Sequence, residues 1–289
     1  AWGGEDDETP LYGVVKIAIK AASGSTLTNT TKTDIVTQLQ KYNVASVRPE
    51  IVDPEITKIL LTSNIKFDEK TTTKTATTLK SDVTTTISNY NTNTLSQFDG
   101  VFRYSKLSSL IDATDSSILS NITTLKIRKD FTPTLASSTK YNVYFRNALY
   151  NPHSGHNSSA GGILESSGFK ISGDSSTVFY LDDDGQGNVR RYSFSGATRV
   201  YANNTQGTID YTTGAITINS LSVLSVENIR GAASTKIELT VKPDSNDVTP
   251  VRDQILEIDT ANSSITVSAD AFVGGSADAG VGYTTTSSY

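Results

Sequence analysis

Cysteine and methionine are both absent from this 289-residue sequence. Without cysteine the chain has no disulfide framework, no thiol nucleophile and no thiolate ligand for a metal, so packing and assembly must stabilise it. A chain of this length usually carries several methionines, and this one opens on Ala1 and Trp2. We therefore expect it to be a portion of a longer protein, and no remnant of a signal peptide is visible.

Strong charge of one sign and long apolar runs are also missing. The chain has 25 basic and 30 acidic residues, a net charge of -5, and no basic cluster of the kind that phosphate binding needs, so we expect no nucleic-acid partner. No apolar stretch approaches the roughly 20 residues of a spanning helix, so we expect no membrane role. The longest run of like charge, Glu5 to Glu8, is interpreted as a solvated linker. With 36% hydrophobic residues the chain should nevertheless fold.

Histidine is scarce, with His153 and His156 in one segment rich in proline and glycine. Their spacing of three residues suits a zinc or iron site, but a third ligand would have to come from elsewhere in the chain and cysteine cannot supply it. Pro152 and Gly155 favour a solvent-exposed loop instead. We therefore predict no metal ligand here.

A run of three carboxylates, Asp182 to Asp184, precedes Gly185-Gln186-Gly187 between two alternating stretches. Successive carboxylates can wrap a calcium ion, but the alternate ligands and distal glutamate of an EF-hand are missing. The glycines do not form a phosphate-binding loop, because no helix follows them. A hairpin turn is the favoured reading.

No other arrangement points to catalysis. The many serines include no Gly-x-Ser-x-Gly elbow, and nothing pairs two carboxylates as glycan cleavage requires. Arg103, Tyr104 and Lys106 form either a contact patch or the ordinary basic start of a helix lying over a sheet. We assign no catalytic, cofactor-binding, metal-binding or small-molecule substrate residue, and predict that the protein is not an enzyme.

The first half of the chain alternates strand and helix patterns, which predicts an α+β domain over residues 1–135. Four strands are expected at 12–20, 48–52, 57–68 and 124–131, and three helices at 31–41, 75–91 and 103–113. This order is that of a ferredoxin-like split β-α-β domain with one helix added. Thr31 or Thr33 is expected to cap the first helix, and a bulge to interrupt strand 57–68. Core candidates over residues 57–131 are Ile59, Leu61, Ile65, Phe67, Leu79, Val83, Ile87, Tyr90, Leu107, Leu110, Ile111, Leu125 and Ile127. Apolar faces are also expected from Val15, Ile17 and Ile19 in strand 12–20 and from Ile35, Val36 and Leu39 in helix 31–41.

The second half changes character and predicts an all-β domain of short antiparallel strands over residues 136–273. Two hairpins are expected, from 178–181 with 189–194 and from 208–211 with 215–219. Further strands are expected at 236–242, 254–259 and 264–268. Residues 274–289 form a tail of glycine, alanine, serine and threonine, too poor in apolar residues to pack unless a neighbour orders it.

Three motifs in sequence order resemble one known family. Phe98-Asp99-Gly100-Val101-Phe102-Arg103-Tyr104-Ser105-Lys106-Leu107 is similar to the C-terminal module of baseplate J-like proteins. The stretches from Gly207 to Ile218 and from Asp247 to Leu256, together with the opening Trp2 to Gly13, resemble the ring-forming wedge subunit of T4-type contractile phage baseplates. The resemblance touches nearly the whole chain, and the order of the motifs carries it.

The resemblance implies a structural virion protein of the tail baseplate, made in the cytoplasm of the bacterial host. It implies association with itself, as a homodimer or through ring contacts, and with other baseplate wedge subunits, and it brings no catalytic residues. The second half and its tail are where we expect the ring contacts. Two other readings stay open at this point: a β-rich carbohydrate-binding or adhesion module, and behind it a glycan hydrolase.

Overall fold

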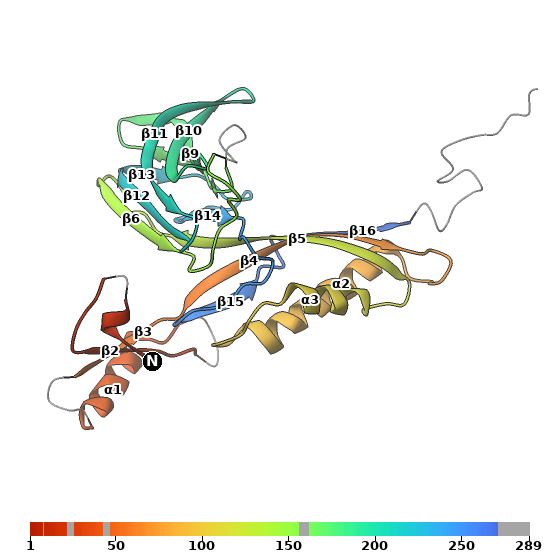
Figure 1. Cartoon of the computed structure of the whole chain (residues 1–289), viewed down its shortest axis with the longest axis horizontal. Helices are drawn as coiled ribbons and strands as arrows, with labels where there is room; N and C mark the ends of the chain where they lie inside the picture. Colours follow the sequence, from red (N-terminus) through yellow and green to blue (C-terminus); the bar gives the residue numbers. More distant parts are fainter. Residues whose placement is uncertain (8, 22–25, 43–46, 156–161, 271–289) are drawn as a thin grey trace, which may run out of the picture.

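The computed structural model describes residues 1–7, 9–21, 26–42, 47–155 and 162–270. The fold is mixed α+β, and its described strands lie in three sheets (Figure 1). The predicted tail 274–289 falls outside the described residues, as does His156.

A small unit at the N-terminus holds one of these sheets, in the order β1-β2-β3. Strand β1 pairs with β2 antiparallel, and β2 pairs with β3 parallel, with α1 packed on β3. Thr28 caps α1, because its side chain accepts a hydrogen bond from the Thr31 amide; the predicted caps Thr31 and Thr33 lie inside the helix. The elements are β1 (Trp2–Gly3), η1 (Gly4–Asp6), β2 (Val14–Ala18), α1 (Asn29–Gln40) and β3 (Arg48–Val52).

The middle of the molecule is a long antiparallel pair of strands with two helices along one side (Figure 1). Thr75 caps the first of these helices through the Thr78 amide, and the four predicted positions from Leu79 to Tyr90 are all buried. The strands are thus joined by helical segments, as the sequence predicts. The elements are β4 (Glu55–Phe67), α2 (Ala76–Tyr90), η2 (Asn91–Leu95), α3 (Tyr104–Asp112) and β5 (Ile118–Phe131).

Strands from the end of the chain complete this central sheet. Strand β14 (Ile237–Val241) pairs with β5, whereas β15 (Gln254–Ile258) and β16 (Ser264–Ala269) run parallel to β4 along its other edge. The prediction that 254–259 and 264–268 are strands of an antiparallel domain is therefore wrong, since both segments pair in parallel with β4. The sheet order is β15-β4-β5-β14-β7, with β16 also on β4.

The arrangement differs from one ferredoxin-like sheet over residues 1–135. Strands β2 and β3 lie in the N-terminal sheet, and β4 and β5 lie in the central one. The predicted alternation of strand and helix is thus distributed over two sheets. The sequence patterns indicate where the strands and helices lie but not which strands pair in a sheet, because parallel pairing depends on long-range packing.

The third sheet has seven strands in the order β13-β8-β9-β10-β11-β12-β6. Both predicted hairpins form, β9 with β10 and β11 with β12, all antiparallel. Its strands, with the short β7 of the central sheet, are β6 (Thr139–Tyr144), β7 (Glu165–Ser166), β8 (Phe169–Ile171), β9 (Asp174–Asp183), β10 (Asn188–Ser195), β11 (Thr198–Asp210), β12 (Ala215–Leu221) and β13 (Val223–Val226).

One continuous apolar core connects the central sheet with the seven-stranded sheet. The core candidates over residues 57–131 are buried with one exception, Leu110, which is 37% exposed. The apolar faces predicted in strand 12–20 and helix 31–41 are only half-buried. The expected bulge does not interrupt the inward positions of β4, because Ser63 is itself buried and keeps the two-residue alternation; the register with β5 shifts between Lys66 and Phe67.

Candidate functional site

Two of the motifs that carry the family resemblance meet in space. Phe102 and Val248 exchange backbone hydrogen bonds of 2.9 and 3.1 Å, although they are far apart in the sequence. Both side chains are fully buried. The motif before α3 is thereby attached to the segment before β15.

Asp247 strengthens this junction by capping a helix that is distant in sequence. Its carboxylate accepts the Tyr104 amide at 2.9 Å and the Arg103 guanidinium at 2.8 Å, at the N-terminus of α3. An acidic group is favourable there because it satisfies a free N–H and the helix dipole. These hydrogen bonds hold the pKa of Asp247 below its usual range.

The predicted basic patch is therefore part of the internal architecture. Arg103 is tied to Asp247, and the Tyr104 hydroxyl donates to the Thr123 carbonyl at 2.9 Å. Lys106 lies apart from them, beside a shallow hollow with Tyr90 and Leu110. The three side chains do not converge on one ligand position.

The remaining motif, Gly207 to Ile218, is the β11–β12 hairpin. A Cβ on Gly207 would lie 1.9 Å from the Thr217 carbonyl oxygen, so only glycine lets the two strands approach this closely. Asp210 accepts the Thr212 and Thr213 amides and closes the turn. The motif is thus explained by backbone packing.

The aspartate run at the end of β9 is satisfied by the protein itself, which confirms the hairpin reading. The Asp182 carboxylate accepts from Arg190 at 2.9 Å and from Arg199 at 2.8 Å. Asp183 is fully buried and accepts the Ile163 and Leu164 amides. The third carboxylate, Asp184, accepts two amides and the Asn188 side chain in the turn.

Histidine supplies no site among the described residues. His153 is exposed, and its Nδ1 lies 3.3 Å from the Ser154 carbonyl oxygen. His156 lies outside the described part of the chain. No group of three or more potential metal-ligating side chains occurs within 1–7, 9–21, 26–42, 47–155 and 162–270, and none of the helices described there is long and apolar enough to cross a bilayer.

The acidic stretch near the N-terminus is more than a solvated linker. The Asp7 carboxylate accepts the Trp2 indole N–H at 2.7 Å and forms an ion pair with Lys16 on β2. Burial raises the pKa of Asp7, but the hydrogen bonds from Lys16 and Trp2 outweigh it and the net direction is downward. The linker prediction is therefore wrong for Asp7, while Glu8 lies outside the described residues.

A buried ionic cluster joins the sheets and was not predicted from the sequence. Lys129 on β5 is 4% exposed and lies 2.6 Å from Glu55, at the start of β4. Arg146, which follows β6, bonds to the same Glu55 at 3.3 Å and to Asp253 at 2.8 Å. Burial lowers the pKa of Lys129, so the paired carboxylate is needed to keep the charge in place.

A second cluster surrounds Arg128, which is 2% exposed. Its guanidinium contacts Asp130 at 3.0 Å, Asp259 at 3.1 Å and Glu238 at 3.3 Å. Arg128 on β5 thereby connects with carboxylates on β14 and after β15. Only the tertiary fold reveals either cluster, since each one joins segments that are far apart in the sequence, such as those of Glu55 and Asp253 or of Arg128 and Asp259.

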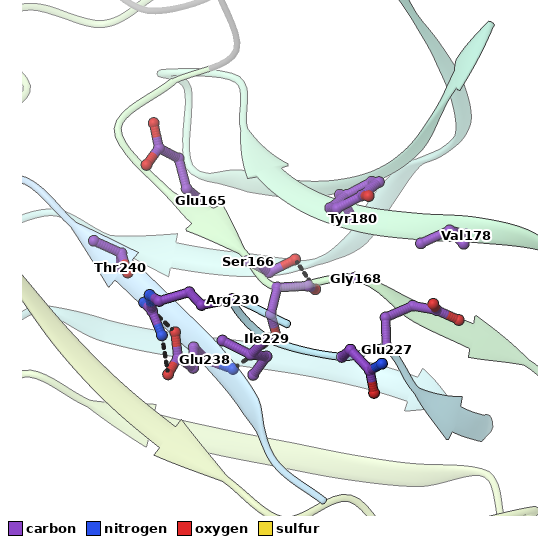
Figure 2. Close-up of a pocket in the computed structure, with 12 residues that line it drawn as sticks. Glu165, Ser166, Gly168, Val178, Tyr180, Glu227, Ile229, Arg230, Glu238 and Thr240 are labelled. Carbon is purple, nitrogen blue, oxygen red and sulfur yellow. Dashed lines mark hydrogen bonds and ion pairs between the residues drawn. The ribbon is translucent and has the colours of Figure 1, made fainter. Parts of the chain in front are cut away.

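One cleft, about 440 Å³, lies between β7, the start of β8, β9 and β14 (Figure 2). Each of its acidic side chains is paired with a basic side chain. Glu238 is bonded to Arg230 at 2.7 Å, Glu165 to Lys126 at 2.7 Å and Glu227 to Lys170 at 3.4 Å. Figure 2 shows Glu165 and Glu227 pointing away from each other.

Large apolar side chains are exposed at several places in the described chain, including Ile122 and Leu135, and two of these surfaces combine aromatic residues. In the N-terminal unit, Tyr12 is 84% and Tyr42 86% exposed, and α1 buries no residue. At the far end of the seven-stranded sheet, Phe194 is 49% exposed against Tyr180 and Tyr192, with ring centroids 5.4 and 5.3 Å away. Exposed apolar surface of this kind is a feature of interaction sites.

Comparison with known proteins gives matches to one family. Residues 1–52 match baseplate structural protein gp6, C-terminal domain I, and residues 57–130 match its C-terminal domain III. The baseplate wedge protein gp6 of Enterobacteria phage T4 is 26% identical over 140 residues, which cover 47% of this chain and 21% of that relative. The two matched regions correspond to the N-terminal unit and to the β4–β5 pair with its helices. The chain therefore corresponds to the C-terminal portion of a T4-type baseplate wedge subunit, a structural protein of the phage tail baseplate.

Proposed function

We propose that the chain associates with copies of itself and thereby links wedges of the baseplate into a ring. The observation that carries this proposal is the pair of family matches over 1–52 and 57–130, because they relate the chain to a wedge subunit through two adjoining domains. A ring multiplies weak interfaces, since each subunit makes the same contact many times.

The physical character of the surface supports an assembly role. The N-terminal unit buries Val14 and little other apolar side chain, and Tyr12, Tyr42 and Leu11 lie exposed on it. A unit of this size gains stability when a neighbour covers such side chains, at roughly 25 cal/mol per Å² of apolar surface removed from water. We propose that this unit contacts other wedge subunits. Both this contact and the self-association are then made in the baseplate of the virion.

We infer that the chain has no catalytic role. The supporting observation is that the carboxylates of the cleft in Figure 2 are paired with cations and that the aspartate run is used inside a hairpin. A carboxylate that is held in an ion pair or in a turn is poorly suited to accept or donate a proton during a reaction.

Sedimentation velocity of the purified chain tests self-association. Over a concentration series from about 1 to 100 µM, the weight-average sedimentation coefficient should rise with concentration, as expected for interfaces of micromolar strength. A single monomeric species over the whole range would overturn the proposal. Salt up to about 1 M should change the result little, because the exposed surface concerned is apolar.

A second candidate function is binding of a carbohydrate by the aromatic end of the seven-stranded sheet. Phe194 is 49% exposed and lies beside Tyr180, with ring centroids 5.4 Å apart. Aromatic faces with polar groups beside them can hold sugar rings. Retention on a glycan array that is lost in Phe194→Ala would favour this function, and absence of retention by the wild type would remove it.

A further inference from the structure

The outer edge of β16 is an open sheet edge. Among the described residues β16 pairs with β4 alone, over six residues in continuous register from Ser264↔Thr62 to Ala269↔Phe67. The Asp270 amide bonds to the Phe67 carbonyl, so the amides of alternate residues before it face β4 in the same way. The backbone groups of Ile265, Val267 and Ala269 therefore face away from β4.

The neighbouring edge strand shows what a covered edge looks like in this molecule. Strand β15 lies on the same side of β4, and η2 packs against it. The side chain of Asn91, at the start of η2, accepts the Ile258 amide at 2.7 Å. No such cover lies against the outer edge of β16 within the described residues, and α2 packs on its face instead.

The other sheet edges in the described chain carry features that discourage pairing. Strand β3 contains Pro49 between Arg48 and Glu50, and the charged Lys140 lies on β6. Strand β13 is partly covered through the bridge from Val223 to Leu135, and β1 and β7 are two residues long. In contrast, Ser264-Ile265-Thr266-Val267-Ser268-Ala269 has no proline, no charge and no bulge. Natural proteins rarely leave such an edge without a partner.

We propose that β16 pairs antiparallel with β16 of a second copy, joining two central sheets into one. This inference rests on the self-association proposed above and names the contact. Charge favours the second copy as occupant, because an uncharged strand placed against itself brings no like charges together. A strongly charged partner strand would gain no complementary charge from this edge.

The flanking charges select the antiparallel direction. In an antiparallel pair about a two-fold axis, the Asp270 residues of the two copies lie at opposite ends of the joined strands, and so do the Lys66 residues that bond to Ser268 at 2.9 Å. A parallel pair would place each residue beside its own equivalent. The antiparallel pair also places Ile265 and Val267, on the α2 side of the sheet, against the same side chains of the other copy.

Charged substitutions on the open face of the strand test this contact in the full chain. Thr266 is exposed there, and its hydroxyl bonds back to Asn64 at 2.6 Å. Thr266→Lys and Thr266→Asp should each raise the dissociation constant of self-association about tenfold or more, since each places two like charges close together across the new pair. An equimolar mixture of the two variants should recover association close to that of the wild type. Thr62→Lys is the matched control, because Thr62 is exposed on the same face but lies on β4, between two strands.

Hydrogen exchange locates the interface independently. When the wild-type concentration is raised, hydrogen exchange at the amides of Ile265, Val267 and Ala269 should slow at least about tenfold. In Thr266→Lys the exchange of the same three amides should not change with concentration. If the wild type associates while Thr266→Lys and Thr62→Lys associate equally well, the β16 contact is wrong and self-association stands. If the wild type stays monomeric, both proposals are wrong. A third outcome is a monomeric chain whose β16 amides are nevertheless protected and which dimerises once residues 271–289 are removed. This result would show that the chain's own tail pairs with β16, and it would overturn the inference.

Discussion

At the scale of single residues, the described structure depends on polar groups that connect distant segments. Asp247 caps a helix begun by Arg103 and Tyr104, and Glu55 neutralises the buried Lys129. Neither role follows from local sequence, because the partners are 143 and 74 positions away, as the residue numbers show. A carboxylate near a helix start is recognisable in sequence only when the two are adjacent.

Asp247→Ala should lower the free energy of unfolding by about 1 kcal/mol, as the loss of a helix cap does. Because the folded pKa of Asp247 lies below the ordinary value of 3.8, its stabilisation is present above that value and is lost as the pH falls through the folded pKa. Urea unfolding at pH 7 and near pH 3 should therefore show a larger difference between wild type and variant at pH 7. Asp247→Asn keeps an acceptor for the Tyr104 amide and should lose less, and Asp244→Ala, an exposed change nearby, should be almost neutral. Equal effects at both pH values would contradict the assigned role.

Glu55→Ala should lower the free energy of unfolding by about 3 kcal/mol, because it leaves the charged Lys129 buried without its carboxylate. Chemical denaturation at pH 7 measures this. Glu165→Ala removes a carboxylate from an ion pair of similar length with Lys126, but both partners are about half exposed, so its effect should stay below about 1 kcal/mol. Similar losses in the two variants would show that the cluster around Lys129 has no special importance.

At the scale of elements, the predictions succeed where one segment contains its own signal. Helix α2 begins at its threonine cap and buries the four predicted positions, and both hairpins form around glycine-containing turns. The predictions fail where the position of a strand depends on its neighbour in the sheet. The patterns of β15 and β16 indicate strands but do not indicate that both pair with β4.

Gly207→Ala tests the hairpin that carries one of the family motifs. The new Cβ would meet the Thr217 carbonyl oxygen at 1.9 Å, so the strands must separate, and we expect a loss of about 2 to 4 kcal/mol. Gly196→Ala is the control in the neighbouring hairpin. Its φ of 61° strains an alanine but its Cβ would meet nothing within 4 Å, so a loss near 1 kcal/mol is expected in thermal or urea unfolding. An equal loss at both sites would mean that strand contact is not what requires Gly207.

At the scale of the whole molecule, the central sheet combines strands from the first half of the chain with strands near the end of its described part (Figure 1). Strand β4 has β5 on one side and β15 and β16 on the other, and the apolar core continues into the seven-stranded sheet. Division at residues 135 and 136 would therefore leave β4 with β5 alone, removing β15 and β16, and would expose core residues such as Ile59.

A fragment of residues 1–135 should consequently lack a cooperative unfolding transition. Circular dichroism on heating measures this, with the full chain as the reference that shows a sigmoidal transition. A fragment that unfolds cooperatively at the same temperature would show instead that the first half folds alone. Residual helix signal without a transition would agree with the expectation, because α2 and α3 carry their own local signals.

Local sequence patterns are sufficient to predict the α+β class, most strands and helices, most of the core and the relation to baseplate wedge subunits. These depend on local periodicity, on turn residues such as Gly214 and on motif order, all of which are present in consecutive residues. The tertiary structure alone decided which strands are neighbours, that Asp247 meets α3, that Lys129 and Arg128 are buried among carboxylates, and that the outer edge of β16 is open among the described residues. The physical reason is that strand pairing and charge burial depend on distances in space, which the order of residues along the chain does not fix.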